Sequence, residues 1–160
     1  MPLFKGAGLK GKRKSFQHDL CPIARSLDAI GDWWSLLIIR DALAGKRRFG
    51  QFQKSLGVAK NILASRLRKL VANGILEILP ASDGSAYQEY VPTEKGRDLH
   101  LVLMAIGQWG ERSLFAPGET QSVLCDRQTG EPLPRIELRA RDGRLLHFSD
   151  TVLKLESQRQ

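Results

Sequence analysis

Apolar residues recur at helical spacing from residue 19 to residue 73 and divide this stretch into four segments. The first, 19–31, has one apolar stripe, and the second, 32–43, is apolar nearly all round. Two more segments follow, of which the first is short and closes at Gly57 and the second covers 58–73. Because two short helices joined around a glycine are typical of a helix-turn-helix motif, the pattern predicts that motif after two core helices.

A strand-like pattern follows at 75–79 and 87–91, with turn residues at 80–85 between them. This arrangement predicts a β-hairpin, which in this position is the wing of a winged helix-turn-helix. Thr93 then fits the N-cap of a long helix that runs to about Phe115 and carries one apolar stripe. The expected fold is therefore mainly α with a small β wing (α+β).

The chain changes character beyond Pro117. Short strand-like segments around 123–124, 136–138 and 145–148 are separated by turns that contain glycine or proline. They predict a short β-rich C-terminal extension that covers an edge, braces a dimer or binds an effector. The expected organisation is a basic mobile arm at 1–18, a winged helix-turn-helix domain for DNA binding and dimerisation at 19–116, and the extension at 117–160.

Charge is segregated along the chain, whose formal net charge is +8. Residues 1–18 carry five Lys or Arg and residues 42–76 carry eight, and neither stretch has an acidic residue. The remainder holds 12 basic residues against all 17 acidic ones, so a mildly acidic body presents two cationic zones. A segment that is both folded and purely cationic favours a polyanion as its partner, here double-stranded DNA.

The segment 58–73 has the polar side that a helix in the DNA major groove needs. Asn can pair with adenine, and Arg and Lys reach guanine edges or phosphates. A solvated helix face is the plainer interpretation, but the absence of acids and the preceding short helix favour recognition. The expected DNA-binding residues are Arg47, Arg48, Lys60, Asn61, Ser65, Arg68 and Lys69.

Other function classes have little support. No stretch approaches the ~20 apolar residues of a membrane-spanning helix, and the basic start lacks the apolar region of a signal peptide. We therefore expect a cytoplasmic protein with no membrane partner. The three histidines are scattered, and no metal-binding, phosphate-loop or paired-acid motif occurs. No enzyme activity, no cofactor and no metal are expected.

Several motifs occur together between Leu20 and Phe115. They are Cys21-Pro22, Ile30-Gly31, Trp34 with Leu37-Ile38-Ile39-Arg40-Asp41, Arg48-Phe49, Leu63 with Arg66-Leu67 and Leu70, Gly74-Ile75, Tyr90-Val91-Pro92-Thr93-Glu94-Lys95-Gly96, and Trp109. In this combination the chain resembles the HxlR-type winged helix-turn-helix transcriptional regulators, relatives of the MarR group. The resemblance implies a homodimer whose first and last core helices form the interface, with recognition helices in successive major grooves of an inverted repeat.

Cys21 has two interpretations. The resemblance implies that some family members sense electrophiles or oxidants through the cysteine that precedes this proline, and a helix start favours the thiolate. Cysteine, however, often simply packs in a protein interior. Redox sensing by Cys21 and inert packing both stay open, and Cys125 in the extension has weaker grounds for either role.

Two positions depart from the family pattern. Ala59 stands where a capping Ser or Thr is expected, so the helix at 58–73 begins without a side-chain cap. The expected wing tip, 81–85, has an acid and no base. We therefore expect DNA backbone contacts from the N-terminal arm or from Arg47 and Arg48 rather than from the wing.

Together these observations predict a transcriptional regulator, expected to be a repressor, that binds an inverted-repeat operator as a homodimer and responds to a small-molecule or electrophile effector. The first alternative is a winged-helix protein-interaction module whose cationic face binds an acidic protein surface. The second is an enzyme whose basic groove holds a phosphorylated small molecule.

Overall fold

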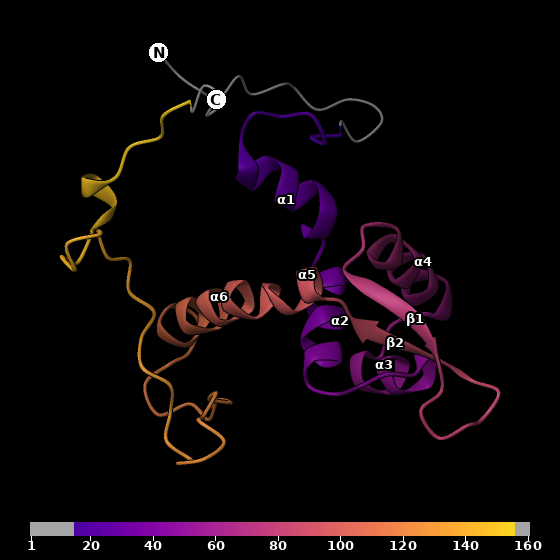
Figure 1. The fold of residues 1–160 in the computed structure, drawn as a ribbon. Coiled ribbons are helices and arrows are strands. Elements are labelled where there is room, and N and C mark those ends of the chain that lie inside the picture. Colours follow the sequence, from indigo (N-terminus) through magenta and orange to yellow (C-terminus); the bar gives the residue numbers. More distant parts are fainter. Residues whose placement is uncertain (1–14, 156–160) are drawn as a thin grey trace. The chain divides into compact units, whose positions relative to one another are not determined.

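The computed structural model describes residues 15–155, so most of the predicted basic arm, residues 1–14, lies outside the described residues. The chain divides into two units, with the boundary in the sequence between His100 and Leu101. Figure 1 labels the helices and strands along the chain. In the described part, none of the helices is long and apolar enough to cross a membrane.

Four helices form the beginning of the first unit, as predicted (Figure 1). They are α1 (Pro22–Ile30), α2 (Trp33–Leu43), α3 (Phe49–Leu56) and α4 (Lys60–Ala72). Asp19, expected inside the first helix, instead precedes it, and its carboxylate accepts a hydrogen bond from the Cys21 amide at 2.8 Å. Pro22 occupies the first turn of α1, where its missing amide hydrogen costs nothing.

The predicted wing follows α4. Strands β1 (Leu76–Pro80) and β2 (Gln88–Pro92) pair antiparallel, with Leu76 opposite Pro92 and Pro80 opposite Gln88. Gly74 turns the chain from α4 into β1 with a φ of 65°, a conformation that glycine adopts without strain. The helices and this hairpin confirm the predicted α+β winged-helix fold.

Helix α2 lies at the centre of the core of the first unit. It contacts α1, α3, α4 and β2, and its Ile38, Ile39 and Ala42 are buried. These contacts on several sides explain why the sequence of α2 is apolar nearly all round. The other large, fully buried apolar side chains come from α3, α4, β1 and the residue before β1, and are Phe52, Leu63, Leu67, Leu70, Ile75 and Leu76.

Helices α3 and α4 form the helix-turn-helix. Gly57 ends α3 in the left-handed conformation, with a φ of 62°, and its amide donates to the Gln53 carbonyl at 2.9 Å. A residue with a side chain is strained in that conformation, so glycine is favoured at this helix end. Val58, in the short turn before α4, is buried.

The helix expected from Thr93 to about Phe115 is interrupted once. It consists of α5 (Glu94–Arg97) and α6 (Leu99–Ser113), which are separated at Asp98. Thr93 is the N-cap of α5, as predicted, and its hydroxyl accepts from the Gly96 amide at 3.1 Å. Gly96 lies so close to the Ile75 carbonyl that a Cβ atom there would overlap the oxygen.

The second unit contains most of α6 and the C-terminal extension. The described part of the extension, 117–155, has less β structure than predicted: two isolated antiparallel bridges and one 3-10 turn, η1 (Phe148–Asp150), with no longer strand. The bridges pair Cys125 with Pro132 and Arg139 with Leu145. Proline offers no amide hydrogen to a ladder, and nearly every side chain in this segment is exposed, so nothing extends the pairing.

One side chain of α6 holds the extension within this second unit. The Gln108 side-chain amide donates to the Pro134 carbonyl at 2.9 Å, and its oxygen accepts from the Ile136 amide at 2.8 Å. Both bonds satisfy backbone groups of the extension that its sparse strand pairing leaves available.

Candidate nucleic-acid interface

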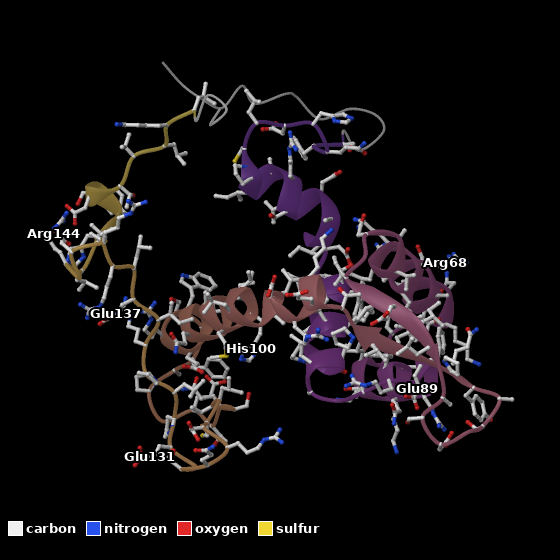
Figure 2. All side chains as sticks on the ribbon, in the orientation of Figure 1. Arg68, Glu89, His100, Glu131, Glu137 and Arg144 are labelled. Atoms are coloured by element: carbon white, nitrogen blue, oxygen red, sulfur yellow. The ribbon has the colours of Figure 1, made fainter. Side chains whose placement is uncertain are left out.

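Helix α4 has one buried side and one exposed side. Leu63, Leu67 and Leu70 are fully buried and anchor the helix in the core. Asn61 and Arg68 are exposed, and Ser65 is half-buried. Figure 2 labels Arg68 on this helix. The polar side predicted from the sequence is therefore accessible.

Four of the predicted DNA-binding side chains have no partner in the part of the chain that the structure describes. Within residues 15–155, no hydrogen bond or ion pair involves the side chains of Lys60, Asn61, Ser65 and Arg68. Their ammonium, amide, hydroxyl and guanidinium groups are available to a ligand. Such groups are the ones that bind base edges and phosphate oxygens.

The N-terminus of α4 lacks a side-chain cap, as predicted. Ala59 is the N-cap residue, and the first turn contains no acidic residue. The Leu63 amide donates to the Ala59 carbonyl at 3.0 Å, so the amides of the preceding helical residues face the open helix end. Their partial positive charge, together with the Lys60 ammonium, suits an anion such as a phosphate.

Two other cations of α4 point toward the junction of α1 and α2. Arg66 Nε lies 2.9 Å from Asp32 Oδ1. The Lys69 ammonium donates to the Asp28 carbonyl oxygen at 2.7 Å. Asp32 is also the N-cap of α2 and accepts from the Ser35 amide at 2.9 Å and from its hydroxyl at 2.6 Å. Lys69, one of the predicted DNA contacts, is thus occupied within the unit.

The ionised form of Asp32 is favoured in the folded protein. Burial alone would raise the pKa of this carboxyl group. The hydrogen bonds from Ser35, together with the charges of Arg66 and Lys69, outweigh burial and lower the pKa below its ordinary value. Asp32 and Arg66 therefore form an ion pair at neutral pH.

Arg47, another predicted DNA contact, binds backbone groups in the loop between α2 and α3. Its Nη1 donates to the Ala42 carbonyl at 2.6 Å and to the Lys46 carbonyl at 3.2 Å. Its own carbonyl accepts from the Tyr90 amide at 2.8 Å. Arg47 therefore connects the end of α2 with β2, and its guanidinium is not directed freely to solvent.

Arg48 is the N-cap residue of α3 and binds the wing. Its Nη2 lies 2.5 Å from Asp83 Oδ2 at the wing tip, and its Nε lies 3.6 Å from Glu89 Oε1 in β2. The guanidinium also lies over the Tyr87 ring, 5.3 Å from its centroid. One arginine therefore holds both the tip and the second strand of the wing against α3.

The Asp83 carboxylate is stabilised where it meets Arg48. Hydrogen bonds from Ser85 and then from Arg48 hold the pKa of Asp83 well below its usual range. The hydrogen bond to Asp83 in turn raises the pKa of Arg48. Both groups are fully charged at neutral pH, and the acid at the wing tip offsets one of the basic charges in the region.

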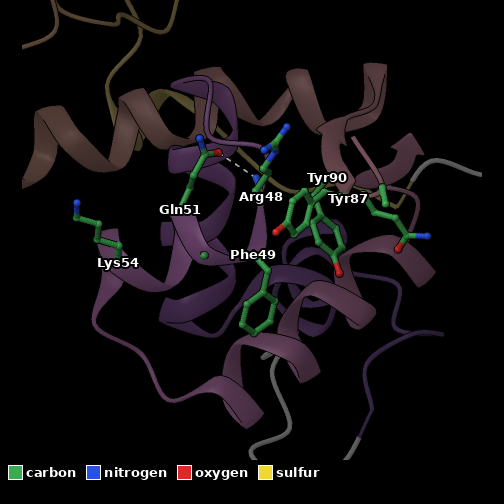
Figure 3. A pocket seen from close by; sticks show the side chains of 9 residues that line it. Arg48, Phe49, Gln51, Lys54, Tyr87 and Tyr90 are labelled. Carbon is green, nitrogen blue, oxygen red and sulfur yellow. Dashed lines mark hydrogen bonds between the residues drawn. The ribbon is translucent and has the colours of Figure 1, made fainter. Parts of the chain in front are cut away.

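An open groove lies between the first turns of α3 and strand β2 (Figure 3). It has a volume of about 810 Å³, and its lining includes Phe49, Gln51, Lys54, Tyr87 and Tyr90. In Figure 3 the two tyrosine rings lie next to each other beside Arg48, and a hydrogen bond joins Gln51 to Arg48. The groove combines aromatic surface with the exposed Lys54 at the edge of the helix-turn-helix.

Cys21 is the N-cap residue of α1, at the helix start where the sequence placed it, and it is half-buried. Two of the large apolar residues that follow it along α1 are exposed. Ile23 is 65% exposed and Leu27 is 54% exposed, and Ile30 is the buried residue of this helix. Together with Leu20, which precedes the helix, these two form the α1 stripe.

Helix α6 has a comparable surface in the second unit. Val102, Ile106 and Trp109 are exposed and recur at helical spacing, and they form the α6 stripe. Among the described residues, α6 has none that is buried. The two stripes are apolar surfaces that their own units leave in contact with solvent.

Sequence reasoning missed Asp32, Arg66 and Asp83 as partners in this region. Asp32 could have been found as a helix cap, because it follows a helix-ending glycine and precedes an apolar run. Its pairing with Arg66 joins positions far apart in the chain and has no local signal. Asp83 is the acid of the wing tip, and no local pattern in the chain indicates that it pairs with Arg48.

Comparisons with known proteins agree with this geometry. The HxlR-like helix-turn-helix family model matches residues 29–116, more than half of the chain. Rv3095, an HTH-type transcriptional regulator of Mycobacterium tuberculosis, is 42% identical over 109 residues, which are 68% of this chain and 69% of that protein.

Two solved structures extend the likeness. PA1607, a candidate transcription factor, is 52% identical with a TM-score of 0.85, and the match covers 89% of this chain and 100% of that one. The redox regulator HypR in its reduced form is 30% identical with a TM-score of 0.53, over 57% of this chain and 91% of that one. The chain therefore belongs to the HxlR-like helix-turn-helix family and is a transcriptional regulator with that fold.

Proposed function

We propose that this protein binds DNA sequence-specifically as a homodimer on an inverted-repeat operator, acts as a repressor in the cytoplasm and has no enzyme activity. The division of α4 carries the proposal. Three buried leucines anchor the helix, while the side chains of Lys60, Asn61, Ser65 and Arg68 have no partner within the described residues. A helix fixed on one side and chemically available on the other can enter a major groove without losing internal contacts.

Asn61, Ser65 and Arg68 are the proposed readers of bases. Their spacing of four and then three residues puts them on one face of α4. Asn can bind adenine through two hydrogen bonds, and Arg can bind guanine in the same way, each worth about 1–3 kcal/mol of discrimination. Ser65, short and half-buried between them, fits a base edge that comes close to the helix.

Phosphate contacts come from cations around this face. Lys60 and the open N-terminus of α4 form one proposed contact, and Lys54 in the groove beside β2 forms a second. Arg48 forms a third once a phosphate replaces Asp83. Arg47 and Lys69, which bind internal carbonyls, support the positions of the wing and of α4.

The α1 and α6 stripes support a dimer. Contiguous exposed apolar surface is uncommon on proteins that act as monomers. In a dimer with a two-fold axis, the same patch of both copies forms the interface, so each stripe can pack against its counterpart. Such a dimer would place its two recognition helices about one DNA turn apart, ~34–36 Å.

The regulator is proposed to respond to an effector, either an electrophile acting on Cys21 or a small molecule. The half-buried position of Cys21 at the start of α1 supports the first, since a helix N-terminus favours the thiolate. Its place next to the α1 stripe would let a modification disturb the dimer. HypR, 30% identical, is named a redox regulator.

Selection from a randomised duplex library at two salt concentrations tests the proposal. Enrichment of an inverted repeat, with affinity that falls steeply as salt rises, is expected. Binding without any enriched motif would favour the alternative of a protein-interaction module whose cationic face meets an acidic partner. Turnover of a phosphorylated small molecule by the purified protein would favour the enzyme alternative.

A further inference from the structure

Two cations of α4, the proposed recognition helix, make contacts that the proposed DNA binding does not use. We infer that Arg66 and Lys69 are positioning residues that fix the angle between α4 and α1, and thereby set the half-site spacing that the dimer accepts. This inference rests on the proposed function. It assigns these residues a task different from that of Arg68, which lies on the same helix.

The two side chains reach one place from one side of α4. They are three residues apart, so they lie nearly above each other on the helix. Arg66 binds Asp32, the residue that begins α2, and Lys69 binds the carbonyl of Asp28 near the end of α1. Helix α4 is in contact with both α1 and α2. The recognition helix is therefore attached at the junction of the two preceding helices.

The Lys69 contact acts on α1 itself. Asp28 lies in the last turn of α1, where the helix dipole favours a cation and where lysine side chains bind backbone carbonyls. At 2.7 Å the ammonium is in full hydrogen-bond contact with the carbonyl oxygen. Lys69, half-buried, therefore stabilises the end of α1 from a different helix.

The junction between α1 and α2 is closely packed. A Cβ atom at Gly31 would overlap the backbone carbonyl of Leu27, so the chain turns closely against the end of α1. Asp32 follows at once and uses one carboxylate for two tasks, the N-cap of α2 and the ion pair with Arg66. A rotation of α1 must therefore strain or break the contacts of α4.

This attachment links recognition to assembly. Helix α1 carries the α1 stripe, which is proposed to meet a second copy, and α4 carries the proposed base readers. The angle between these two helices determines where each recognition helix lies relative to the two-fold axis. Two charged contacts at the junction therefore determine which half-site spacing fits both helices at once.

The experiment compares full-length variants on DNA with one half-site and on repeats of varied spacing. Arg66→Met and Lys69→Met keep an apolar stem and remove the charge, and Asp32→Asn keeps an N-cap residue while removing the ion pair. Arg68→Met is the matched control on the same helix. The DNA series is built on the motif that the library selection enriches.

The positioning variants should bind a single half-site nearly as the wild type does, but their preference for the best spacing should fall about tenfold. Arg68→Met should weaken binding at every spacing and keep the same optimum. If Lys69→Met weakens every DNA equally and reduces the salt dependence, Lys69 is a phosphate contact and the inference is wrong. Unchanged spacing preference in Arg66→Met and Asp32→Asn would also overturn it.

Hydrogen exchange without DNA provides a second readout. Amides of residues 25–30 in α1 should exchange faster in Arg66→Met and Lys69→Met than in the wild type or Arg68→Met, while the amides of β1 and β2 stay protected. If α1 exchanges at the same rate in these variants as in the wild type, the attachment is refuted, even if the wild type binds an operator. If the wild type selects no DNA motif, the proposed function fails and this measurement still judges the attachment.

Discussion

Arg48 Nη2 lies 2.5 Å from Asp83 Oδ2, so the residue that caps α3 is bound to the tip of the wing. A carboxylate and a DNA phosphate offer a guanidinium the same kind of acceptor. Asp83 therefore occupies a cation that the backbone of an operator would otherwise attract. The wing of this protein therefore neutralises one positive charge of the helix-turn-helix and adds no basic residue at its tip.

Removal of the acid at the wing tip should strengthen DNA binding. In Asp83→Asn, Arg48 loses its closest acidic partner and keeps Glu89 at 3.6 Å, so its Nη2 becomes available to phosphate. Affinity should rise several-fold at low salt, and the salt slope should steepen by up to about one. Fluorescence anisotropy on the operator across a salt series measures both. Asp142→Asn is the control, since it removes an exposed acid paired with Arg144 in the extension. Equal gains in both variants would mean that only net charge matters.

Arg68→Ala tests base recognition. If the guanidinium binds a guanine, the variant should lose about 1–3 kcal/mol of operator binding and relax the preference at one position. Library selection with the variant measures that preference directly. A uniform loss on all sequences would make Arg68 a phosphate contact instead.

Asp32→Ala should destabilise the fold by about 1 kcal/mol at neutral pH, because α2 loses its cap and Arg66 its partner. The folded-state pKa of Asp32 is lowered. Its contribution is therefore fully present above the unfolded pKa, about 3.9, and is lost as pH falls through the folded pKa. Urea unfolding at several pH values should show the two proteins converging below about pH 4. A constant difference down to strong acid would assign the effect to something other than ionised Asp32.

Gly96→Ala should destabilise the protein by about 1–3 kcal/mol, because the new Cβ overlaps the Ile75 carbonyl and forces α5 away from the start of the wing. Gly107→Ala in α6 is the matched change, since nothing lies near its Cβ position. It should be neutral or stabilising by up to about 1 kcal/mol. Thermal unfolding of both compares them, and equal effects would contradict the close approach at Gly96.

Cys21→Ser tests the proposed thiol response. Diamide or a quinone should release the wild type from its operator and leave Cys21→Ser bound, because the half-buried thiol at the start of α1 is the proposed target. Cys125→Ser, which removes the exposed cysteine of the extension, should respond as the wild type does. Release of Cys21→Ser by the same reagents would leave Cys21 as an ordinary packed residue.

The elements of the first unit could be predicted from the sequence because their signals are local. Apolar spacing located α1 to α4, Gly57 marked the turn between α3 and α4, and the wing strands differ from prediction by about one residue. The C-terminal segments also alternate in polarity, but a strand needs a partner. Apart from the bridges at Cys125–Pro132 and Arg139–Leu145, nothing pairs with them in the described residues.

The roles of the cations in α4 could not be predicted in the same way. Helical spacing puts Arg68 and Lys69 together on the polar side. Lys69 donates a hydrogen bond to the carbonyl of Asp28, which lies 41 positions earlier in the chain. This contact forms only when the chain folds, so the sequence pattern cannot distinguish Lys69 from Arg68. Residue type and spacing thus located the candidate interface, while tertiary contacts decided which of its charges remain available.

Helix α1 buries one residue, Ile30, and exposes Ile23 and Leu27. A nine-residue helix is too short to be stable in water on its own. Its order depends on contacts with α2 and α4 and, in the proposed dimer, on a second copy of the chain. Dilution that separates this proposed dimer should therefore melt α1 before the rest of the first unit. Expression level would then help to set occupancy of the operator twice, once through the number of molecules and once through the fraction that keeps α1 folded.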